Sequence, residues 1–267
     1  MNKKVVLITG ASRGLGKAIA EVYHRNKFIV IATDIISENI SLISEREGFT
    51  NMKLDVTSEN NIKQCAVFVE EKYGRLDVLI SNAGVFDFYP VSEAGLKKLK
   101  EIFDVNVLGL SNLTKYFLPL LSKSAGRLIV ISSESYKVPA PFQPYAVSKK
   151  ALESLYQAIK NELSIKGINS ILIRPGAIQT HIMDQTLQFH DKLKETQFKK
   201  EFAKFTKTVP SYINRISSPQ QVADIVLKAG TKSKPKQVYS INHNPLVTLL
   251  SMLPARFKNY IIQKSLS

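Results

Sequence analysis

The sequence predicts an α/β fold in which a doubly wound parallel sheet of about seven strands carries helices on both faces. Short runs of Val, Ile and Leu alternate with segments of helical period, and strand–helix–strand repetition with short links is typical of right-handed crossovers between parallel strands. Several runs are near-continuous, as in strands that are buried on both faces. A length of 267 residues suits one such domain.

Each predicted element follows from its own run of residues. The predicted strands are Val5–Ile8, Phe28–Ala32, Asn51–Leu54, Val78–Ile80, Leu128–Ile131, Ser170–Ile173 and Gln237–Ile241. The predicted helices are Leu15–Asn26, Ser58–Tyr73, Glu93–Ser122, Tyr145–Lys166 and Pro219–Ala229. Pro119 is expected to bend or end the third helix, because proline lacks the N–H that a helix interior needs. We find no internal repeat or Pro/Gly-rich linker, so residues 1–267 are interpreted as a single domain.

Two segments fall outside this alternation and are predicted to be appended helices. Ile182–Pro210 is rich in lysine and contains several phenylalanines, and Pro245–Ile262 mixes many apolar residues with basic ones. The chain carries 37 Lys and Arg against 22 Asp and Glu, a net charge of +15, and residues His190–Ser267 hold 14 basic and 4 acidic residues. Such an excess fits nucleic acid, an anionic membrane or anionic ligands. No DNA-reading helix stands out, so we expect no nucleic-acid partner.

The composition also excludes several classes of site. The single cysteine, Cys65, cannot form an internal disulfide or a cysteine-based metal site, and the 4 histidines lack metal-ligand spacing. We therefore expect no metal. No apolar run approaches the roughly 20 residues that cross a bilayer, and the apolar run at Val5–Ile8 is too short for a signal-peptide core. A reduced, cytoplasmic compartment is expected.

A glycine-rich turn follows the first predicted strand and opens the first predicted helix. Gly10, Gly14 and Gly16 stand in the spacing Gly-x-x-x-Gly-x-Gly. Without side chains the backbone N–H groups can approach a pyrophosphate, and the helix N-terminus adds positive potential. The turn is predicted to bind the phosphates of a dinucleotide in a Rossmann-like fold. A glycine-rich turn without a ligand is the alternative.

Asp34 ends the second predicted strand and bears on the choice of dinucleotide. A carboxylate there accepts hydrogen bonds from both ribose hydroxyls of an adenosine and repels a 2′-phosphate. At about 4 Å and an effective dielectric near 20, like charges cost about 4 kcal/mol. Arg13 acts in the opposite direction, because a guanidinium pairs with that phosphate. The sequence favours NAD(H) and leaves open NADP(H), or a strand-end acid without a ligand.

Tyr145 and Lys149 are the candidate acid–base pair. They stand at i and i+4, on one helix face about 6 Å apart. An ammonium at that range favours phenolate, so we expect the pKa of Tyr145 to fall below its usual value near 10, which suits proton transfer. The preceding strand ends in Ser132 and Ser133, and the carboxyl ends of parallel strands form the ligand crevice.

These motifs, taken in order, resemble the short-chain dehydrogenase/reductase family over roughly residues 4 to 241. The matching segments are Thr9–Gly16 with the TGxxxGxG cofactor loop, Leu54-Asp55-Val56 with the adenine-contacting strand end, Asn82-Ala83-Gly84 with the NAG motif, Asn106 with the tetrad asparagine, Tyr145 and Lys149 with YxxxK, and Arg174-Pro175-Gly176 plus Thr180 with PG-x-x-x-T. The resemblance implies an NAD(P)-dependent oxidoreductase. The cofactor-binding residues that it implies, together with those reasoned above, are Gly10, Ser12, Arg13, Gly14, Leu15, Gly16, Asp34, Asp55, Val56, Asn82, Ala83, Gly84, Tyr145, Lys149, Pro175, Gly176, Ile178 and Thr180.

The resemblance also implies catalytic roles. Tyr145 exchanges a proton with the carbonyl or alcohol oxygen, and a serine hydrogen-bonds the same oxygen. Lys149 holds the nicotinamide ribose and lowers the pKa of the tyrosine, while Asn106 anchors a water that links Lys149 to solvent. The family's usual offset of 13 residues selects Ser132 as the serine, whereas strand alignment selects Ser133. We favour Ser133, because strand register fixes side-chain direction and loops absorb deletions.

The two appended segments bear on substrate and partners. The segment at about 182–210 lies where this family carries its substrate lid, and its phenylalanines, among them Phe198, Phe202 and Phe205, suggest an apolar pocket wall. A core-packing role for some of them is the alternative. The tail at about 244–264 resembles tails of members that act on lipophilic alcohols and ketones, such as steroids and retinoids. It is expected to contact an anionic membrane or, alternatively, to cap the active site or form a dimer contact. A homo-oligomer, dimer or tetramer, is expected from the resemblance.

Three classes of function follow. The first is hydride transfer between a nicotinamide cofactor and a lipophilic alcohol or ketone. The second is reduction of a 3-oxoacyl thioester, in which an acidic carrier protein contacts the basic surface. The third is a non-catalytic dinucleotide-binding protein. The combined set of Asn106, Ser133, Tyr145 and Lys149 argues against the third class, because a protein that only binds has no need of an activated tyrosine.

Overall fold

The sheet is the feature that places the site. The computed structural model describes residues 3–36, 47–138, 140–179, 196–208 and 216–266. It contains a seven-stranded sheet in the order β3-β2-β1-β4-β5-β6-β7, and each neighbouring pair is parallel. The strands are β1 (Val5–Thr9), β2 (Ile29–Asp34), β3 (Phe49–Lys53), β4 (Val78–Ser81), β5 (Arg127–Ile131), β6 (Asn169–Pro175) and β7 (Val238–Ile241). The predicted doubly wound parallel sheet is confirmed.

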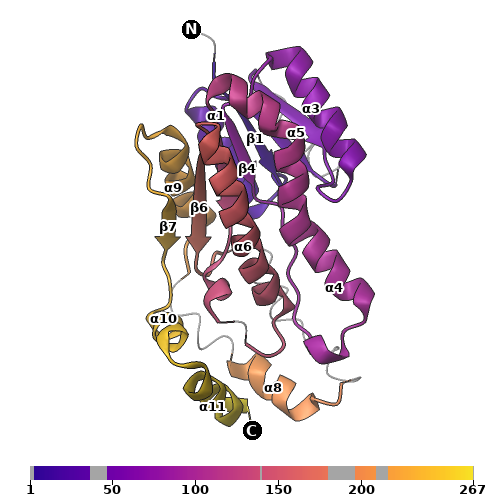
Figure 1. The fold of residues 1–267 in the computed structure, drawn as a ribbon, viewed down its shortest axis with the longest axis vertical. Helices are drawn as coiled ribbons and strands as arrows, with labels where there is room; N and C mark the ends of the chain where they lie inside the picture. The colour runs from indigo at the N-terminus through magenta and orange to yellow at the C-terminus, as the bar shows by residue number, and fades with distance from the viewer. Residues whose placement is uncertain (1–2, 37–46, 139, 180–195, 209–215, 267) are drawn as a thin grey trace.

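Helices cover both faces of the sheet (Figure 1). The helices that pack on it are α1 (Gly14–Arg25), α3 (Glu59–Tyr73), α5 (Gly109–Ser124), α6 (Pro144–Ile165) and α9 (Pro219–Thr231). Alternate residues of β1 face opposite layers: Val6 and Ile8 pack with α1 and α9, whereas Val5 and Leu7 pack with α3, α5 and α6. Because successive side chains of a strand point to opposite faces, the near-continuous apolar runs fill two cores at once.

The third predicted helix is divided into several elements. The chain forms η1 (Val91–Glu93), α4 (Leu96–Phe103), a π-helical turn η2 (Asp104–Leu108) and then α5. Pro119 does not end α5, which continues to Ser124, so that part of the expectation is wrong. The proline is exposed, where water can bind the carbonyl that it leaves free. Buried Leu120 and Leu121 hold the last turns against the core.

The described parts of the appended segments lie beyond the carboxyl edge of the sheet, in the lower part of Figure 1. Within the predicted lid the structure describes α8 (Lys199–Thr208), and residues 180–195 and 209–215 lie outside the described residues. The tail forms two helices, α10 (Pro245–Met252) and α11 (Ala255–Leu266). A short turn, η3 (Glu134–Lys137), follows β5 and contacts α10. Helices α8, α10 and α11 therefore lie at the side of the molecule where the strands end (Figure 1).

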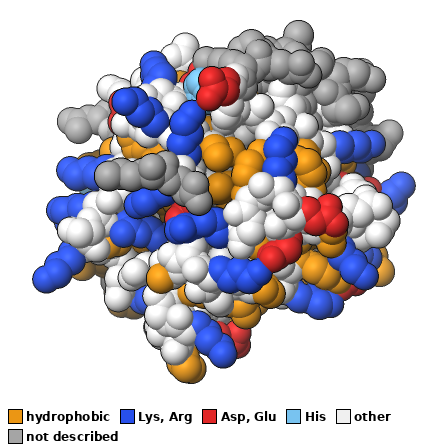
Figure 2. Space-filling model, turned by 90° about the horizontal axis from the view of Figure 1, so that it is seen from above, with side chains coloured by type: hydrophobic (Ala, Val, Ile, Leu, Met, Phe, Trp, Pro, Cys, Tyr) orange, Lys and Arg blue, Asp and Glu red, His pale blue; other side chains and the backbone are white. Residues whose placement is uncertain are grey.

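The surface charge is widely distributed. Figure 2 shows the opposite end of the molecule, with Lys and Arg side chains spread over it among acidic and apolar ones. The excess positive charge is therefore not confined to the tail. Among the described residues, no helix is long and apolar enough to cross a membrane, and no group of three or more His, Cys, Asp or Glu side chains is placed to hold a metal ion.

Candidate active site

The glycine turn leads from β1 into α1 and has a backbone that only glycine fits well. Gly10 and Gly14 have φ of +64° and +53°, a region where side chains with a Cβ are strained. Gly16 has a different reason: a Cβ built on it would overlap the Gly10 carbonyl oxygen. The turn is therefore tight and bare on the side that faces the strand ends.

Asn82, at the end of β4, supports this turn from the side. Its Nδ2 donates to the carbonyl oxygens of Thr9 at 2.9 Å and Gly10 at 3.1 Å. In return the Thr9 hydroxyl accepts from the backbone N–H groups of Asn82 and Ala83, both at 3.0 Å. The predicted Asn82-Ala83-Gly84 segment thus fixes the shape of the glycine turn.

The N-terminus of α1 fits a dinucleotide phosphate. Arg13 is the N-cap residue in extended conformation, and in the described structure no side chain caps α1 and no acidic residue occupies its first turn. The first N–H groups of a helix lack partners within it, and with the helix dipole they favour an anion. An anionic phosphate therefore fits this bare turn and uncapped helix end. The predicted cofactor-binding residues that lie here are Gly10, Ser12, Arg13, Gly14, Leu15 and Gly16.

Asp34 lies beside the glycine turn, at the end of β2. Its Oδ2 accepts hydrogen bonds from the Ser12 backbone N–H at 3.1 Å and the Ser12 hydroxyl at 2.6 Å. Its Oδ1 accepts from the Ile36 N–H at 3.4 Å, and the residue is partly exposed at this end of the strand. Further along the edge, Asp55 accepts from Thr57 N and Oγ1 at 2.8 and 2.7 Å, which makes a local turn before α3. The neighbouring Val56 is buried.

The catalytic candidates meet where α6 crosses the end of β5. Tyr145 and Lys149 share one face of α6, and Lys149 Nζ lies 5.6 Å from the centre of the Tyr145 ring. The Lys149 ammonium donates to the Ile131 carbonyl oxygen at 3.0 Å. The Ser133 side chain lies near enough to Tyr145 to lower the pKa of that phenol in part, and its Oγ accepts hydrogen bonds from Ser135 N at 3.3 Å and Ser135 Oγ at 3.0 Å. The Ser132 hydroxyl, by contrast, is buried and donates to Glu153 at 2.7 Å. Strand alternation thus turns Ser133, and not Ser132, toward the tyrosine.

Asn106 joins this group from the π-helical turn η2. Its Oδ1 accepts from Val85 N at 2.8 Å, and its Nδ2 donates to Val85 O and Ser148 Oγ, both at 2.9 Å. A Cβ built on Gly84 would lie 3.3 Å from Asn106 Oδ1 and 3.8 Å from Lys149 Nζ, so the glycine lets the segment after β4 come close to both. Wide helical turns of this kind occur often at functional sites.

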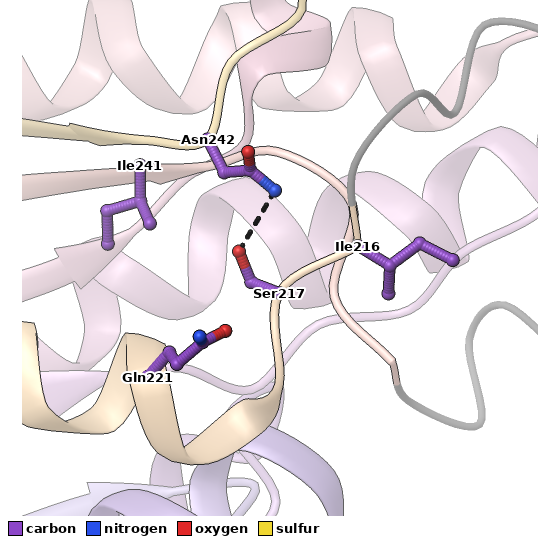
Figure 3. Close-up of a pocket in the computed structure, with 5 residues that line it drawn as sticks. All are labelled: Ile216, Ser217, Gln221, Ile241 and Asn242. Atoms are coloured by element: carbon purple, nitrogen blue, oxygen red, sulfur yellow. Dashed lines mark hydrogen bonds between the residues drawn. The ribbon is translucent and has the colours of Figure 1, made fainter.

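The end of β6 borders the same crevice. Gly176 N donates to Ile241 O at 2.8 Å, and a Cβ on Gly176 would overlap the Asn242 carbonyl. Ile178 forms a bridge with Ser217, and Thr180 lies outside the described residues. An open pocket of about 500 Å³ lies next to this segment, and Figure 3 shows the residues that line it. The pocket is lined by Ile216, Ser217, Gln221, Ile241 and Asn242 and includes none of the catalytic candidates.

The glycine turn, Asn82, Asn106, Ser133, Tyr145 and Lys149 thus lie along one edge of a parallel sheet. Residues 4–191 match the short chain dehydrogenase family. The chain belongs to the short-chain dehydrogenase/reductase family. It is an NAD(P)-dependent oxidoreductase, as expected from the sequence.

Relatives of known name agree with this assignment. The chain is 30% identical, over 98% of its length and 97% of the relative's, to a protein of Ornithobacterium rhinotracheale named NADPH-dependent 3-dehydrocapnine reductase. It is 32% identical, over 84% of its length and 89% of the relative's, to a 3-oxoacyl-(acyl-carrier-protein) reductase of Thermotoga maritima. A solved short-chain dehydrogenase from Streptomyces avermitilis has the same fold, with a TM-score of 0.80, 24% identity and coverage of 99% of this chain and 97% of that one.

Burial sets the protonation of the pair that this dehydrogenase carries. It raises the pKa of Tyr145 to about 12, although the hydrogen bond with Ser133 lowers it in part. Burial also lowers the pKa of Lys149 to about 8, against the raising effect of Glu153. The expectation of a net fall in the tyrosine pKa is therefore wrong. The cost of burying a phenolate outweighs the nearby ammonium, which is hydrogen-bonded to Ile131 instead of the phenol.

A wall of phenylalanines completes the dehydrogenase site. The Phe86 ring lies 4.8 Å from the Tyr145 ring, centre to centre, and 4.8 Å from Phe88. Phe88 contacts Phe205 of α8 at 5.2 Å, and Phe142 contacts Phe202 of α8 at 5.2 Å. These four buried rings, Phe88, Phe142, Phe202 and Phe205, with Phe86 and Leu266 packed against them, are called the aromatic wall below.

Sequence reasoning found only part of the aromatic wall. The phenylalanines of the predicted lid were expected to form a pocket wall or to pack in a core, and Phe202 and Phe205 are buried. The contributions from the loops after β4 and before α6 were missed. The usable signal was Phe86 and Phe88 directly after the Asn82-Ala83-Gly84 motif, and Phe142 just before Tyr145. Phe142 has a φ of +65°, a strained backbone for a residue with a side chain, of the kind that gathers at functional sites.

Proposed function

We propose that this enzyme transfers a hydride between NAD(H) and a lipophilic alcohol or ketone, with Asn106, Ser133, Tyr145 and Lys149 as the catalytic residues. The observation that carries the proposal is the meeting of Ser133, Tyr145 and Lys149 at the end of β5, beside an aromatic wall. The nicotinamide supplies the hydride when it is bound. The protein has to hold the two reactants and move one proton.

Tyr145 and Ser133 are the residues that act on the substrate oxygen. A phenol whose pKa is about 12 is protonated at neutral pH, so the Tyr145 hydroxyl donates its proton to the carbonyl oxygen in the reducing direction. The Ser133 hydroxyl donates a hydrogen bond to the same oxygen and stabilises the charge that develops there. Placing both donors on rigid elements, a helix and a strand end, keeps them in reach of one atom.

Lys149 and Asn106 are proposed to support the proton transfer. Lys149, one turn from Tyr145, holds the nicotinamide ribose and passes the proton to replace the one that the tyrosine loses. Asn106 anchors a water that connects Lys149 to solvent. Support for this path comes from Gly84, which lies close to both Asn106 Oδ1 and Lys149 Nζ, and from the Asn106–Ser148 hydrogen bond that ties η2 to α6.

We further propose that the enzyme prefers NAD(H) to NADP(H). Asp34 is held in place by two hydrogen bonds from Ser12 and keeps part of its surface exposed beside the glycine turn. A 2′-phosphate brought about 4 Å from this carboxylate would be repelled by about 4 kcal/mol at an effective dielectric near 20. Arg13 opposes that effect, and the Ornithobacterium relative is named NADPH-dependent.

The substrate class follows from the aromatic wall. Phe86 lies against Tyr145, and the four buried rings behind it continue this apolar environment to α8, with Leu266 of α11 packed against them. Apolar and aromatic side chains next to the reacting centre favour flat or extended hydrocarbon frameworks over small hydrophilic alcohols. A hydroxysteroid-like or retinoid-like alcohol or ketone fits this environment.

A 3-oxoacyl thioester is the second candidate substrate. The Thermotoga relative bears that activity in its name, and an acyl chain also suits an aromatic wall. The net charge of +15 would attract an acidic carrier protein. Activity on a 3-oxoacyl thioester with NADPH, and not on cyclic or isoprenoid alcohols, would favour this candidate.

The tail is proposed to contact an anionic membrane. Leu246, Leu249 and Met252 on α10 are 56%, 62% and 78% exposed, and α11 presents exposed Phe257, Tyr260 and Ile261. The tail also carries Arg256, Lys258 and Lys264 and no acidic residue. A second copy on this face would bring like charges together, whereas anionic lipid headgroups balance them. Helices with such a composition lie in the membrane interface.

Sedimentation with vesicles tests the membrane contact. We expect the protein to bind vesicles that contain phosphatidylglycerol more strongly than neutral phosphatidylcholine vesicles. Replacing Leu249 and Phe257 by serine should weaken this binding, while Ile165→Ser, at an even more exposed apolar residue on α6 (83%), should not. Equal binding of the wild type and the double variant, or no binding at moderate salt, would refute the contact.

Two further proposals concern assembly and compartment. We propose a homo-oligomer formed through the helices α5 and α6, supported by exposed Leu108 at the start of α5 and by the family assignment. Light scattering during gel filtration tests it, and a monomeric mass at micromolar concentration would refute it.

We also propose a reduced, cytoplasmic compartment, since Cys65 is a buried free thiol.

A panel of substrates tests the central proposal. Lipophilic alcohols and ketones, small sugars and a 3-oxoacyl thioester are each assayed with NAD(H) and NADP(H) in parallel. We expect turnover of a lipophilic substrate with NAD(H), and loss of that turnover by at least about 10²-fold in Tyr145→Phe, the low end of what a general acid contributes. Turnover near the wild-type rate in Tyr145→Phe would overturn the assignment of the proton donor.

A further inference from the structure

Glu153 is a buried carboxylate that the proposed reaction does not use. It lies on α6, one turn after Lys149, and is only 7% exposed. Burying a charged carboxylate is unfavourable unless partners compensate it. Both of its oxygens have partners: Oε1 accepts from Ser132 Oγ at 2.7 Å and from Arg174 Nε at 3.0 Å, and Oε2 accepts from Arg174 Nη2 at 2.6 Å.

The contact between Glu153 and Ser132 adds to the contacts that hold α6 against the end of β5. Three successive turns of α6 contact three consecutive residues: Tyr145 meets Ser133, Lys149 meets the Ile131 carbonyl, and Glu153 meets Ser132. The first two contacts belong to the catalytic group. The third holds the residue between them, so Glu153 limits how far Ser133 can rotate or slide relative to Tyr145.

The Arg174 side of the contact reaches the other edge of the crevice. Arg174 lies on β6 directly before Pro175 and Gly176, and the Ser132 N–H donates to Ile173 O at 2.8 Å, so β5 and β6 are also joined here. The Arg174 guanidinium stacks on the Tyr136 ring at 4.3 Å, and Tyr136 belongs to the turn η3 that follows Ser133. One carboxylate therefore connects α6 with β5, β6 and η3.

We propose that Glu153 is a positioning residue for the reaction: through Ser132 it holds Ser133 against Tyr145, and it supplies the buried negative charge that balances the Lys149 ammonium. The proposal rests on the proposed function for the roles of Ser133, Tyr145 and Lys149. It assigns to Ser132 a structural part in the same arrangement, which explains why two adjacent serines end β5.

Among the described residues, few charged or titratable groups surround Lys149 and Glu153, and these determine how Glu153 acts on the Lys149 ammonium. In the part of the chain that the structure describes, Glu153 is the charged group that acts on Lys149, and the neutral Tyr145 ring lies 5.6 Å from its ammonium. Around Glu153 itself lie Arg174 and the rings of Tyr136 and Tyr156. Since Glu153 raises the pKa of Lys149, removing its charge should move that pKa from about 8 to a lower value.

Three variants separate position from charge. Glu153→Gln keeps a hydrogen-bond acceptor for Ser132 but removes the charge. Ser132→Ala keeps the charge but removes the hydrogen bond, and Arg174→Lys keeps both the carboxylate and a cation. Glu162→Gln, at an exposed glutamate of the same helix, is the matched control and should behave as the wild type.

Two readouts distinguish these roles from plain structural support. In the ligand-free protein, the titration of the Lys149 side chain is followed by NMR of 13C-labelled lysine, with Lys149→Met to assign the signal. We expect the Lys149 titration to move to lower pH in Glu153→Gln and to stay in place in Ser132→Ala. In turnover, we expect kcat of Ser132→Ala to fall about tenfold with little change in KM, because a displaced Ser133 acts only on the developing charge.

The outcomes decide the proposal. If Glu153→Gln lowers the melting temperature but leaves the Lys149 titration unchanged, the electrostatic role is refuted. If Ser132→Ala turns over at the wild-type rate, the positioning role is refuted. Should Glu153→Gln fail to fold, Arg174→Lys and Ser132→Ala still test the positioning role. A Lys149 titration that moves to lower pH in Ser132→Ala, where the Glu153 charge is kept, would then refute the electrostatic role. The NMR titration needs no substrate, so a failure of the proposed function would be recognised separately.

Discussion

The burial of Lys149 predicts a measurable conflict between stability and activity. A free lysine has a pKa of 10.5, whereas burial lowers the pKa of Lys149 to about 8. Between these two pH values the unfolded chain holds a proton that the folded protein has released, so folding becomes more favourable as pH rises. At about 1.4 kcal/mol per pH unit, the full difference is about 3 kcal/mol, present as a cost below pH 8 and removed as pH approaches 10.5.

The perturbation that reveals this cost is Lys149→Met, which keeps the length of the side chain and removes the charge. Losing the hydrogen bond to Ile131 O is a penalty of about 1–3 kcal/mol that does not depend on pH in this range. The pH-dependent part is separable: the stability of the wild type relative to Lys149→Met should increase by about 2 kcal/mol between pH 7.5 and 9.5.

Urea unfolding followed by circular dichroism at several pH values measures this difference. Comparing the two proteins at each pH cancels the contributions of groups that they share, including Tyr145. A difference in unfolding free energy that stays constant from pH 7.5 to 9.5 would refute the reasoning, because it would mean that Lys149 keeps an ordinary pKa in the folded protein. Lys149→Met should also lose turnover. The buried Lys149 ammonium would then be a group that the enzyme needs for activity although it lowers the stability of the fold.

The remaining predictions concern the glycine turn, the cofactor, the serine and the aromatic wall. Gly16→Ala should abolish cofactor binding measured by fluorescence titration, or prevent folding, because its Cβ would overlap the Gly10 carbonyl; unchanged binding would contradict the tight turn. Asp34→Ser should raise kcat/KM with NADP(H) relative to NAD(H) by about 10²-fold or more, from the repulsion worked out above; an unchanged ratio would show that Asp34 does not select the cofactor. Ser133→Ala should lower kcat by about 10²-fold or more, a larger loss than that of Ser132→Ala, and the reverse order would exchange their roles. Phe202→Ala should cost about 3–5 kcal/mol in thermal or urea unfolding, because the ring is fully buried, and should raise KM for a lipophilic substrate.

The sequence predicted the elements better than their interruptions. All seven strands were found, because runs such as Val5–Ile8 and Leu128–Ile131 must be apolar throughout when both faces of a strand are covered. The division of the third helix was not found. The π-helical turn at Asn106 arises from tertiary hydrogen bonds to Val85 and Ser148, and such bonds leave no periodic signal in the helix itself.

The spacing of the motifs predicted which residues lie in the candidate site. It did not predict the pKa of Tyr145, because that pKa depends mainly on burial. Motif order brought Asn106, Tyr145 and Lys149 together correctly as neighbours, and strand alternation turned Ser133 toward Tyr145. The i, i+4 spacing of Tyr145 and Lys149 shows that an ammonium is near, but it does not show how deeply the phenol is buried, and burial is the larger effect on its pKa. The role of Glu153 was missed for a related reason, since its partners are distant in sequence: Ser132 directly follows β5, and Arg174 lies in β6.

Leu266 packs on the aromatic wall next to Phe202 and Phe205, and this contact has a practical consequence for how the enzyme is handled. Any polypeptide joined after residue 266, such as an affinity tag, emerges beside the surface that is proposed to receive the substrate. Purification handles are therefore better placed at the amino end, on the far side of the sheet (Figure 1). Comparing substrate KM between the two tagged forms would also report how much the last turn of α11 shapes that surface.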